Sequence, residues 1–278
     1  MSFSMRRGGN MVGGRFLIAI ILALVSVAGY YMSSQKNPIT GENQHVAMSP
    51  EQEVALGLQA APEMAQQYGG LYPDEEAQAL VDRVGNKVVA GSPAAQSGYP
   101  FEFHLLADPN TINAFALPGG QVFITAALLN KLDTEGELAG VLGHEVGHVI
   151  GRHGAEHMAK AQLTQGLTGA AVIATYDPND PSTRNTAAVT AMIGQLINLK
   201  YGRDDELESD KLGVKFASDA GYDPRSMLRV MTVLADASSG QAPPEFMSSH
   251  PDPGNRSERI EQAIQEMFPN GVPEGLVK

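Results

Sequence analysis

Two histidines four residues apart, with a glutamate directly after the first, are the residues of this chain whose types and spacing point most clearly to chemistry. They are His144, Glu145 and His148. On a helix that turns by about 100° per residue, the two histidines lie about 40° apart and both can reach one metal ion. Glu145 lies about 100° from His144, which keeps it off the metal but close to a water molecule bound there. We therefore interpret His144 and His148 as metal ligands and Glu145 as the general base.

The segment around this motif predicts an amphipathic helix. Thr134 followed three residues later by Glu137 has the spacing of a capping box. Apolar residues then recur at helical spacing, namely Leu138, Val141, Leu142, Val146 and Val149. This context argues against the alternative that the pattern is accidental and that the histidines are ordinary polar residues on a helix.

A catalytic zinc site needs a third protein ligand and an open position for water. His153 almost completes the extended HExxHxxGxxH signature of the metzincins, but that signature places its third histidine at the position of Gly154. On a helix that continues past Gly151, His153 and His157 would lie about 180° and 220° round from His144. We therefore expect both to be solvated or structural, although together they could make a weak second metal site.

An acidic segment downstream, RDDELESDKLG at residues 203–213, offers a better third ligand. HExxH followed by a helix with E-x-x-[small]-D resembles the membrane-linked gluzincin zinc metallopeptidases, the family of HtpX, BepA, LoiP, Oma and the CAAX prenyl endopeptidases. The resemblance implies that Glu206 is the third zinc ligand and that Asp210 orients a ligating histidine. Glu208 lies about 200° from Glu206 on a helix and should face elsewhere. We interpret Asp204, Asp205 and Glu208 as a solvated face.

Residues 113–125, NAFALPGGQVFIT, predict a β-hairpin in which Pro-Gly-Gly makes the turn between two apolar runs. In the family that the chain resembles, such a hairpin precedes the zinc helix, and its exposed edge strand binds an extended substrate by main-chain pairing. A purely structural hairpin is the alternative. The resemblance implies a substrate-binding strand at Asn113, Ala114, Phe115 and Ala116.

Residues 248–256, SSHPDPGNR, are similar to the S/T-H-P-x-x-x-x-R element of the same family. Proline and glycine predict a rigid turn here rather than a helix. His250 in this turn could hydrogen-bond the oxyanion of the tetrahedral intermediate, or could swing onto zinc and block the water position. A turn histidine without a catalytic part is the alternative. We assign no catalytic role to His45 and His104.

The N-terminal segment predicts export. Arg6, Arg7 and Arg15 precede an uncharged apolar run at residues 16–32, and the next charge is Lys36. The run is close to the ~20 residues that cross a bilayer, and the arginines predict a cytoplasmic N-terminus with the rest of the chain outside. Cleavage near Ala28 is the alternative, and it would leave a protein that is soluble in the periplasm or secreted.

The expected organisation has five parts. They are a cytoplasmic basic N-terminus (1–15), a signal anchor or transmembrane segment (16–35), a polar tether (36–48), a zinc metallopeptidase domain (49–267) and a C-terminal tail (268–278). The predicted fold class is α+β, a helix-rich gluzincin domain with a small sheet and an HExxH active-site helix. Apolar segments at 163–176 and 187–199 are too short to span a membrane, and they predict core or lid helices or a helical pair on the membrane surface.

Composition narrows the function classes. The net charge of −12 and the lack of a basic cluster argue against nucleic acid as a partner. The chain has no cysteine, which excludes disulfides and thiol chemistry and suits an oxidising envelope compartment.

We therefore expect a zinc-dependent endopeptidase of the cell envelope. One zinc ion per chain would be bound by His144, His148 and Glu206, and Glu145 would activate the attacking water. The resemblance implies misfolded or unassembled envelope proteins as substrates, bound as unfolded or extended polypeptides, and an inner-membrane location with the catalytic domain on the periplasmic side. Two alternatives stay open: a zinc-binding envelope chaperone or adaptor whose latent proteolysis is blocked by His250, and a non-peptidase hydrolase with the same zinc site.

Overall fold

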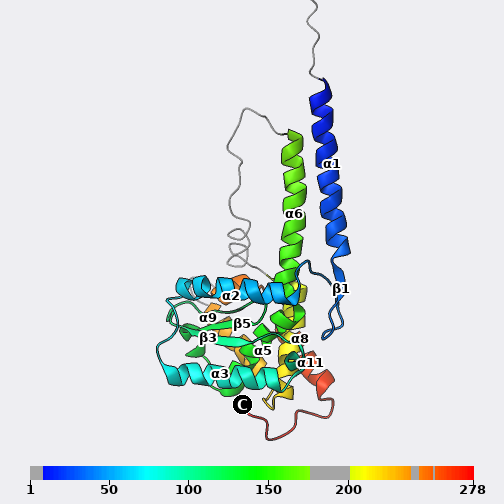
Figure 1. Cartoon of the computed structure of the whole chain (residues 1–278). Coiled ribbons are helices and arrows are strands. Elements are labelled where there is room, and N and C mark those ends of the chain that lie inside the picture. Colours follow the sequence, from blue (N-terminus) through cyan, green and yellow to red (C-terminus); the bar gives the residue numbers. More distant parts are fainter. Residues whose placement is uncertain (1–8, 176–200, 239–243, 253) are drawn as a thin grey trace, which may run out of the picture.

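Most helices pack around a small sheet, and two helices, α1 (Gly9–Met32) and α6 (His153–Thr175), project side by side from this body (Figure 1). The computed structural model describes residues 9–175, 201–238, 244–252 and 254–278. The long helices are α1 (Gly9–Met32), α2 (Pro50–Gln67), α3 (Glu75–Ala90), α5 (Glu135–Gly151), α6 (His153–Thr175), α8 (Arg203–Asp219), α9 (Ser226–Ser238) and α11 (Arg256–Met267). The short helices are η1 (Pro93–Gln96), α4 (Ala126–Leu129) and α10 (Glu245–Ser249), and the strands are β1 (Ser34–Lys36), β2 (Asn43–His45), β3 (Glu102–Leu106), β4 (Ala114–Leu117) and β5 (Gln121–Thr125). The predicted helix-rich α+β class is confirmed, whereas the segment 187–199 lies outside the described residues.

Side chains cap the first turns of three helices, among them the helix predicted to start at Thr134. Ser49 and Gln52 form a complete capping box at α2, and Asp74 caps α3. At α5 the Thr134 hydroxyl accepts a hydrogen bond from the backbone N–H of Glu137. The carboxylate of Glu137, however, accepts from the N–H of the residue before Thr134, so only half of the predicted box forms there. These local bonds satisfy N–H groups that the first turn of a helix leaves unpaired.

The larger sheet has the strand order β3-β5-β4. β4 and β5 form the predicted antiparallel hairpin, and β3 pairs with β5 in parallel. At the turn between β4 and β5, Gly119 and Gly120 have φ of 84° and 108°, which a residue with a side chain rarely adopts. In this strand order β4 is one of the two edge strands, as the hairpin prediction required.

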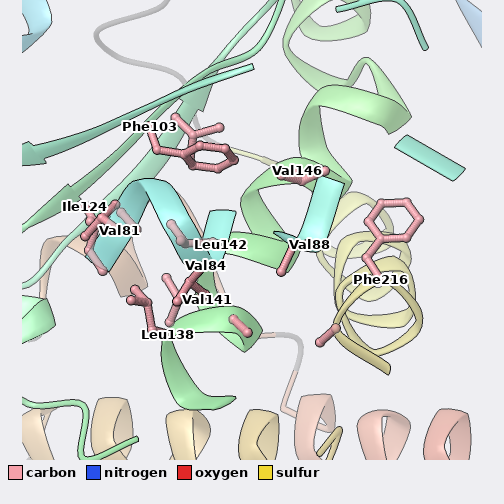
Figure 2. Close-up of a cluster of buried hydrophobic side chains, with 14 of the residues drawn as sticks. Val81, Val84, Val88, Phe103, Ile124, Leu138, Val141, Leu142, Val146 and Phe216 are labelled. Atoms are coloured by element: carbon pink, nitrogen blue, oxygen red, sulfur yellow. The ribbon is translucent and has the colours of Figure 1, made fainter. Parts of the chain in front are cut away.

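The main core lies between α3, the sheet, α5 and α8 (Figure 2). It buries one face of α3, the inner side of β3 and β5, and the apolar positions of α5 that helical spacing predicted. Figure 2 labels Val81, Val84, Val88, Phe103, Ile124, Leu138, Val141, Leu142, Val146 and Phe216. Burial of each such side chain contributes about 1.5–3 kcal/mol, so this core fixes α5 firmly against α8.

Glycines let α5 and α8 approach each other closely. A Cβ atom added to Gly213 of α8 would lie 2.9 Å from the backbone nitrogen of His144, and one added to Gly143 of α5 would lie 3.1 Å from the carbonyl oxygen of Gly213. Because nothing separates the two backbones here, side chains from the first turns of α8 reach the histidines of α5 directly.

The segment expected as a polar tether, residues 36–48, lies against the end of α5. Asn37 Nδ2 donates to the carbonyl oxygen of Ile150 at 2.7 Å, and Gln44 Nε2 donates to that of Gly151 at 2.7 Å. Both side chains are buried. They satisfy carbonyl groups that the last turn of a helix leaves without a partner.

α1 packs along α6, and a Cβ atom added to Gly166 of α6 would overlap the hydroxyl of Ser26 on α1. Several large apolar side chains of α1, among them Phe16 and Leu24, are exposed. Among the described residues, no helix has both the length and the apolarity needed to cross a membrane, so the predicted spanning helix is not seen.

Candidate metal centre

Four buried side chains bring metal-binding atoms together at the centre of the body. His144 and His148 come from α5, Glu206 from the first turn of α8, and His250 from the residue after α10. The two Nε2 atoms of the α5 histidines lie 3.1 Å apart, and the Glu206 oxygens lie 3.5 and 3.4 Å from them. His250 Nδ1 lies 3.4 Å from His144 Nε2 and 3.1 Å from Glu206 Oε1.

These spacings fit a tetrahedral metal site. Bonds of about 2.0–2.1 Å from zinc to nitrogen or oxygen place neighbouring ligand atoms about 3.3 Å apart. The five measured separations run from 3.1 to 3.5 Å.

The charges around the cluster also favour a cation. The carboxylates of Glu145, Glu206 and Asp210 are all buried, and Arg256 is the one permanently charged cation that contacts them in the described part of the chain. Buried charges are costly unless they are paired. A divalent ion among the four donors would balance the excess negative charge.

Asp210 holds His144 from the side opposite to the cluster. Its Oδ1 lies 2.9 Å from Nδ1 of His144, one helical turn beyond Glu206. Arg256 at the start of α11 donates to both oxygens of Asp210 at 2.7 Å, and its Nη1 lies 3.1 Å from Glu206. We assigned no role to Arg256 from the sequence, although it is the arginine that ends the S-H-P-x-x-x-x-R element.

Buried partners shift the pKa values of these groups. Burial alone would lower the pKa of His144, but Asp210 and Glu206 outweigh it and raise the pKa to about 9. Burial would raise the pKa of Glu206, yet the charge of His250 and hydrogen bonds from the α5 histidines hold it well below its usual range. The pKa of His148 is lowered well below its usual value by burial. From the protein groups alone, Glu206 is therefore ionised and His148 neutral, as metal ligands must be.

Glu145 lies next to the donors but is not one of them. Burial raises the pKa of its carboxyl group. Neither of its oxygens has a hydrogen-bond partner within the described chain, and Nε2 of His250 lies 3.7 Å from Oε1. An unpaired buried carboxylate beside a metal site has the position and the basicity of a general base.

The angular position expected for His153 on a continuous helix does not occur. α5 ends at Gly151, and Arg152 adopts a left-handed conformation with φ of 56°, so α6 is not a continuation of the same helix. His153 is buried, and its Nδ1 lies 2.9 Å from Nδ1 of His148. Angular positions calculated along a straight helix do not apply beyond such a turn.

Two acids expected on a solvated face are in fact partners of histidines. Glu208 Oε2 lies 3.3 Å from Nε2 of His153, and Asp205 Oδ2 lies 2.6 Å from Nε2 of His157. Asp205 also accepts a hydrogen bond from the backbone of Gly202 and so starts α8. Neither His153 nor His157 belongs to the group of four metal donors found in the described segments.

The predicted substrate strand is covered in this structure. All of β4 is buried, and Asn113 directly before it donates to the hydroxyl of Tyr68 at 3.1 Å. Tyr201 donates to the carbonyl oxygen of Ala116 at 3.3 Å, and its ring stacks on that of His148 at 3.8 Å. The sequence analysis missed Tyr201, because no motif precedes α8 to indicate that an aromatic ring there lies over a metal ligand.

His250 is placed by a short helix rather than by a turn alone. α10 includes Ser248 and Ser249, which the proline and glycine pattern predicted to be non-helical, and His250 ends it by donating its backbone N–H to Phe246. The His250 ring also stacks on that of Phe246. His45 and His104 lie elsewhere, His45 stacked on Tyr30 and His104 stacked on Phe123.

The sequence matches known proteins over most of its length. The model of peptidase family M48 matches residues 75–264. The beta-barrel assembly-enhancing protease of Yersinia pestis is 30% identical over 267 residues, which are 94% of this chain and 54% of that protein. The mitochondrial metalloendopeptidase OMA1 of Schizosaccharomyces pombe is 30% identical over 258 residues, 88% of this chain and 71% of that protein. The chain thus spans about half the length of the beta-barrel assembly-enhancing proteases that it matches.

Proposed function

The chain belongs to peptidase family M48, and from this membership we propose that it is a zinc-dependent endopeptidase that acts on misfolded or unassembled proteins of the cell envelope. The observation that carries the proposal is the group of four buried metal donors beside the unpaired carboxylate of Glu145. Relatives named as beta-barrel assembly-enhancing proteases support a substrate among envelope proteins.

We assign the metal to His144, His148 and Glu206. Zinc, when bound there, lowers the pKa of a water molecule and polarises the scissile carbonyl. Glu145 accepts the proton of the attacking water and passes it to the leaving amine. Its burial raises its pKa, which makes it a stronger base than an exposed carboxylate and so suits this transfer. Asp210 keeps His144 in the tautomer whose Nε2 binds the metal.

His250 gives this arrangement a resting state. Its Nδ1 lies 3.4 Å from His144 Nε2 and 3.1 Å from Glu206 Oε1, where it would fill the position that a catalytic zinc site leaves open for water. Of the two roles open for His250, the geometry supports the blocking one. Catalysis then requires His250 to leave, and the short helix α10 that carries it to move.

We propose that an extended polypeptide pairs with the outer edge of β4. Such a substrate needs the carbonyl oxygen of Ala116, which Tyr201 now occupies. Tyr201 must therefore move away before the substrate binds. Asn113, Ala114 and Phe115 supply the remainder of this edge.

The test uses the full chain and an unfolded casein-like substrate. Glu145→Gln is expected to retain zinc but to lose cleavage, because the amide cannot accept a proton. His148→Ala is expected to lose both metal and cleavage. Chelator-sensitive cleavage by the wild type alone supports the proposal, and full activity of Glu145→Gln would refute it.

A zinc-binding chaperone or adaptor with latent proteolysis is the second candidate function. The observation that favours it is the fourth protein donor, because a closed tetrahedral site is typical of structural zinc. The variant His250→Ala distinguishes the peptidase from the chaperone or adaptor. A blocked peptidase gains activity in this variant and keeps its metal through three donors, whereas a chaperone gains no cleavage.

We further propose that α1 associates with a membrane and that the metallopeptidase domain lies on the outer side of the inner membrane. Exposed apolar side chains of α1, such as Ile18 and Val25, support the association. The arginines before residue 16 support the orientation. Carbonate extraction of cell membranes tests the association, and N-terminal sequencing of the isolated protein tests cleavage near Ala28.

Because the chain has a net charge of −12, we expect no nucleic-acid partner.

A further inference from the structure

A strained residue marks the end of the helix that carries the histidines. Arg152 is the one non-glycine residue with positive φ in the described part of the chain, at φ 56° and ψ 28°. Such conformations persist only where the surroundings hold them in place, and they gather at functional sites. Arg152 lies four residues after His148, so the turn that it makes directly adjoins the proposed metal centre.

Four hydrogen bonds hold this turn. Arg152 Nε donates to the buried carboxylate of Glu53 at 2.8 Å, and Nη2 donates to the carbonyl oxygen of Met48 at 2.8 Å. Asn37 and Gln44 bind the last carbonyl groups of α5 from the other side. Residues 37–53, about one hundred positions earlier in the chain, thus fix this backbone reversal.

The reversal returns His153 to the side of His148. The rings lie 5.0 Å apart at 80°, with the two Nδ1 atoms 2.9 Å apart, and His153 is only 2% exposed. Gly151 makes the space, since a Cβ atom at this position would overlap the ring of His153. Nε2 of His153 faces Glu208 at 3.3 Å, and Ser209 Oγ lies 3.3 Å from its Nδ1.

The positions of the ring protons of His148 and His153 follow from where the four metal donors lie. Nε2 of His148 faces the other donors, so it carries no proton when it binds a metal, and the proton of this ring is then on Nδ1. Nδ1 of His148 therefore donates, and Nδ1 of His153 accepts. His153 carries its own proton on Nε2 and donates it to Glu208.

We propose that His153 is a positioning residue that fixes the ring orientation and the tautomer of His148, with Glu208 fixing His153 in turn. His144 receives the equivalent support from Asp210. The two histidines of one motif thus have different partners, a carboxylate for the first and an imidazole for the second. This inference rests on the proposed function only in taking His148 as a metal ligand.

The test measures zinc affinity of the full chain by competition with a chromophoric chelator at one fixed pH. His153→Leu keeps the bulk and removes the acceptor, and it is expected to weaken zinc binding about 10- to 100-fold. His153→Asn places an oxygen near the position of Nδ1 and is expected to recover most of the affinity. His157→Leu is the matched control, because His157 lies one turn further along α6 and contacts Asp205 instead.

A second variant tests the same contact without changing the histidine. Gly151→Ala crowds the His153 ring and is expected to weaken zinc binding to a similar degree. Visible spectra of the cobalt-substituted proteins report ligand geometry directly, and they are expected to change in His153→Leu and Gly151→Ala but not in His157→Leu. Thermal unfolding of each metal-free variant shows whether the fold is retained.

Equal affinity in His153→Leu and wild type would overturn the proposal, as would an equal loss in His157→Leu. A loss confined to His153→Leu and Gly151→Ala, with recovery in His153→Asn, supports it. Weakened binding in His153→Leu, together with zinc binding but no cleavage by both the wild type and His250→Ala, would support the positioning role and contradict the peptidase.

Discussion

Two hydrogen bonds of 2.7 Å join the buried side chains of Arg256 and Asp210. The pair lies next to His144, the histidine that begins the HExxH motif. The pair joins α11 to α8 and sets the direction of the Asp210 carboxylate towards His144 Nδ1. Burial would raise the pKa of Asp210, but the charge of Arg256 keeps it low, so the carboxylate is ionised when it faces the histidine.

Arg256→Lys is expected to weaken zinc binding by about tenfold, because a single ammonium group cannot reproduce the planar two-bond contact that orients Asp210. Arg256→Gln leaves two buried carboxylates without their cation and is expected to cost about 3–5 kcal/mol of stability. Chelator competition and denaturant unfolding measure the two effects. Arg259→Gln, an exposed arginine of the same helix, is the control and should change neither.

Zinc affinity is expected to rise with pH up to about 9 and then to level off. The pKa of His144 is raised to about 9 in the protein alone, so at neutral pH a proton occupies the site and must leave when the metal binds. Affinity should therefore gain about tenfold per pH unit for this one proton below that value. Chelator competition across this range checks the slope, and calorimetry in two buffers counts the protons released. An affinity that does not change between pH 7 and 9 would contradict the prediction.

Tyr201→Phe is expected to raise kcat/KM for an unfolded substrate about fivefold. The phenylalanine keeps the stacking on His148 but loses the hydrogen bond to Ala116, which is worth about 1 kcal/mol. Burial raises the pKa of the Tyr201 hydroxyl well above its usual value, so it is a donor at every pH of interest. Peptide-cleavage kinetics measure the change, with Tyr72→Phe outside the site as the control. A loss of cleavage without loss of zinc would instead make the Tyr201 hydroxyl part of the catalytic machinery.

Gly213→Ala is expected to destabilise the protein by about 1–3 kcal/mol through overpacking. The added methyl group meets the backbone of His144 at 2.9 Å, so α8 must move and take Glu206 with it. Zinc affinity should therefore fall together with stability. Lys215→Ala, on the exposed side of α8, should leave zinc affinity unchanged. Full stability and affinity in Gly213→Ala would show that the close approach of the two helices is not required.

Short-range features of this protein were determined by the sequence itself. His144, Glu145 and His148 share a helix, and their relative directions follow from helical geometry alone. The capping of α2 and the β4–β5 hairpin likewise depend on neighbouring residues and could be predicted. Glu206 required a resemblance to known proteins, because spacing along the chain does not determine which acid of a run faces a distant helix.

The surroundings of the site were decided by tertiary structure. His153 could not be placed without the turn at Arg152, and Glu53, ninety-nine residues earlier, holds that turn. The contact of Tyr201 with Ala116 likewise joins positions eighty-five residues apart. Arg256 approaches Asp210 only because α11 packs beside α8. A local sequence pattern reflects backbone geometry over a few residues. The contacts of His153, Tyr201 and Arg256 depend instead on packing between elements that are distant in the chain, and no periodicity in the sequence encodes that packing.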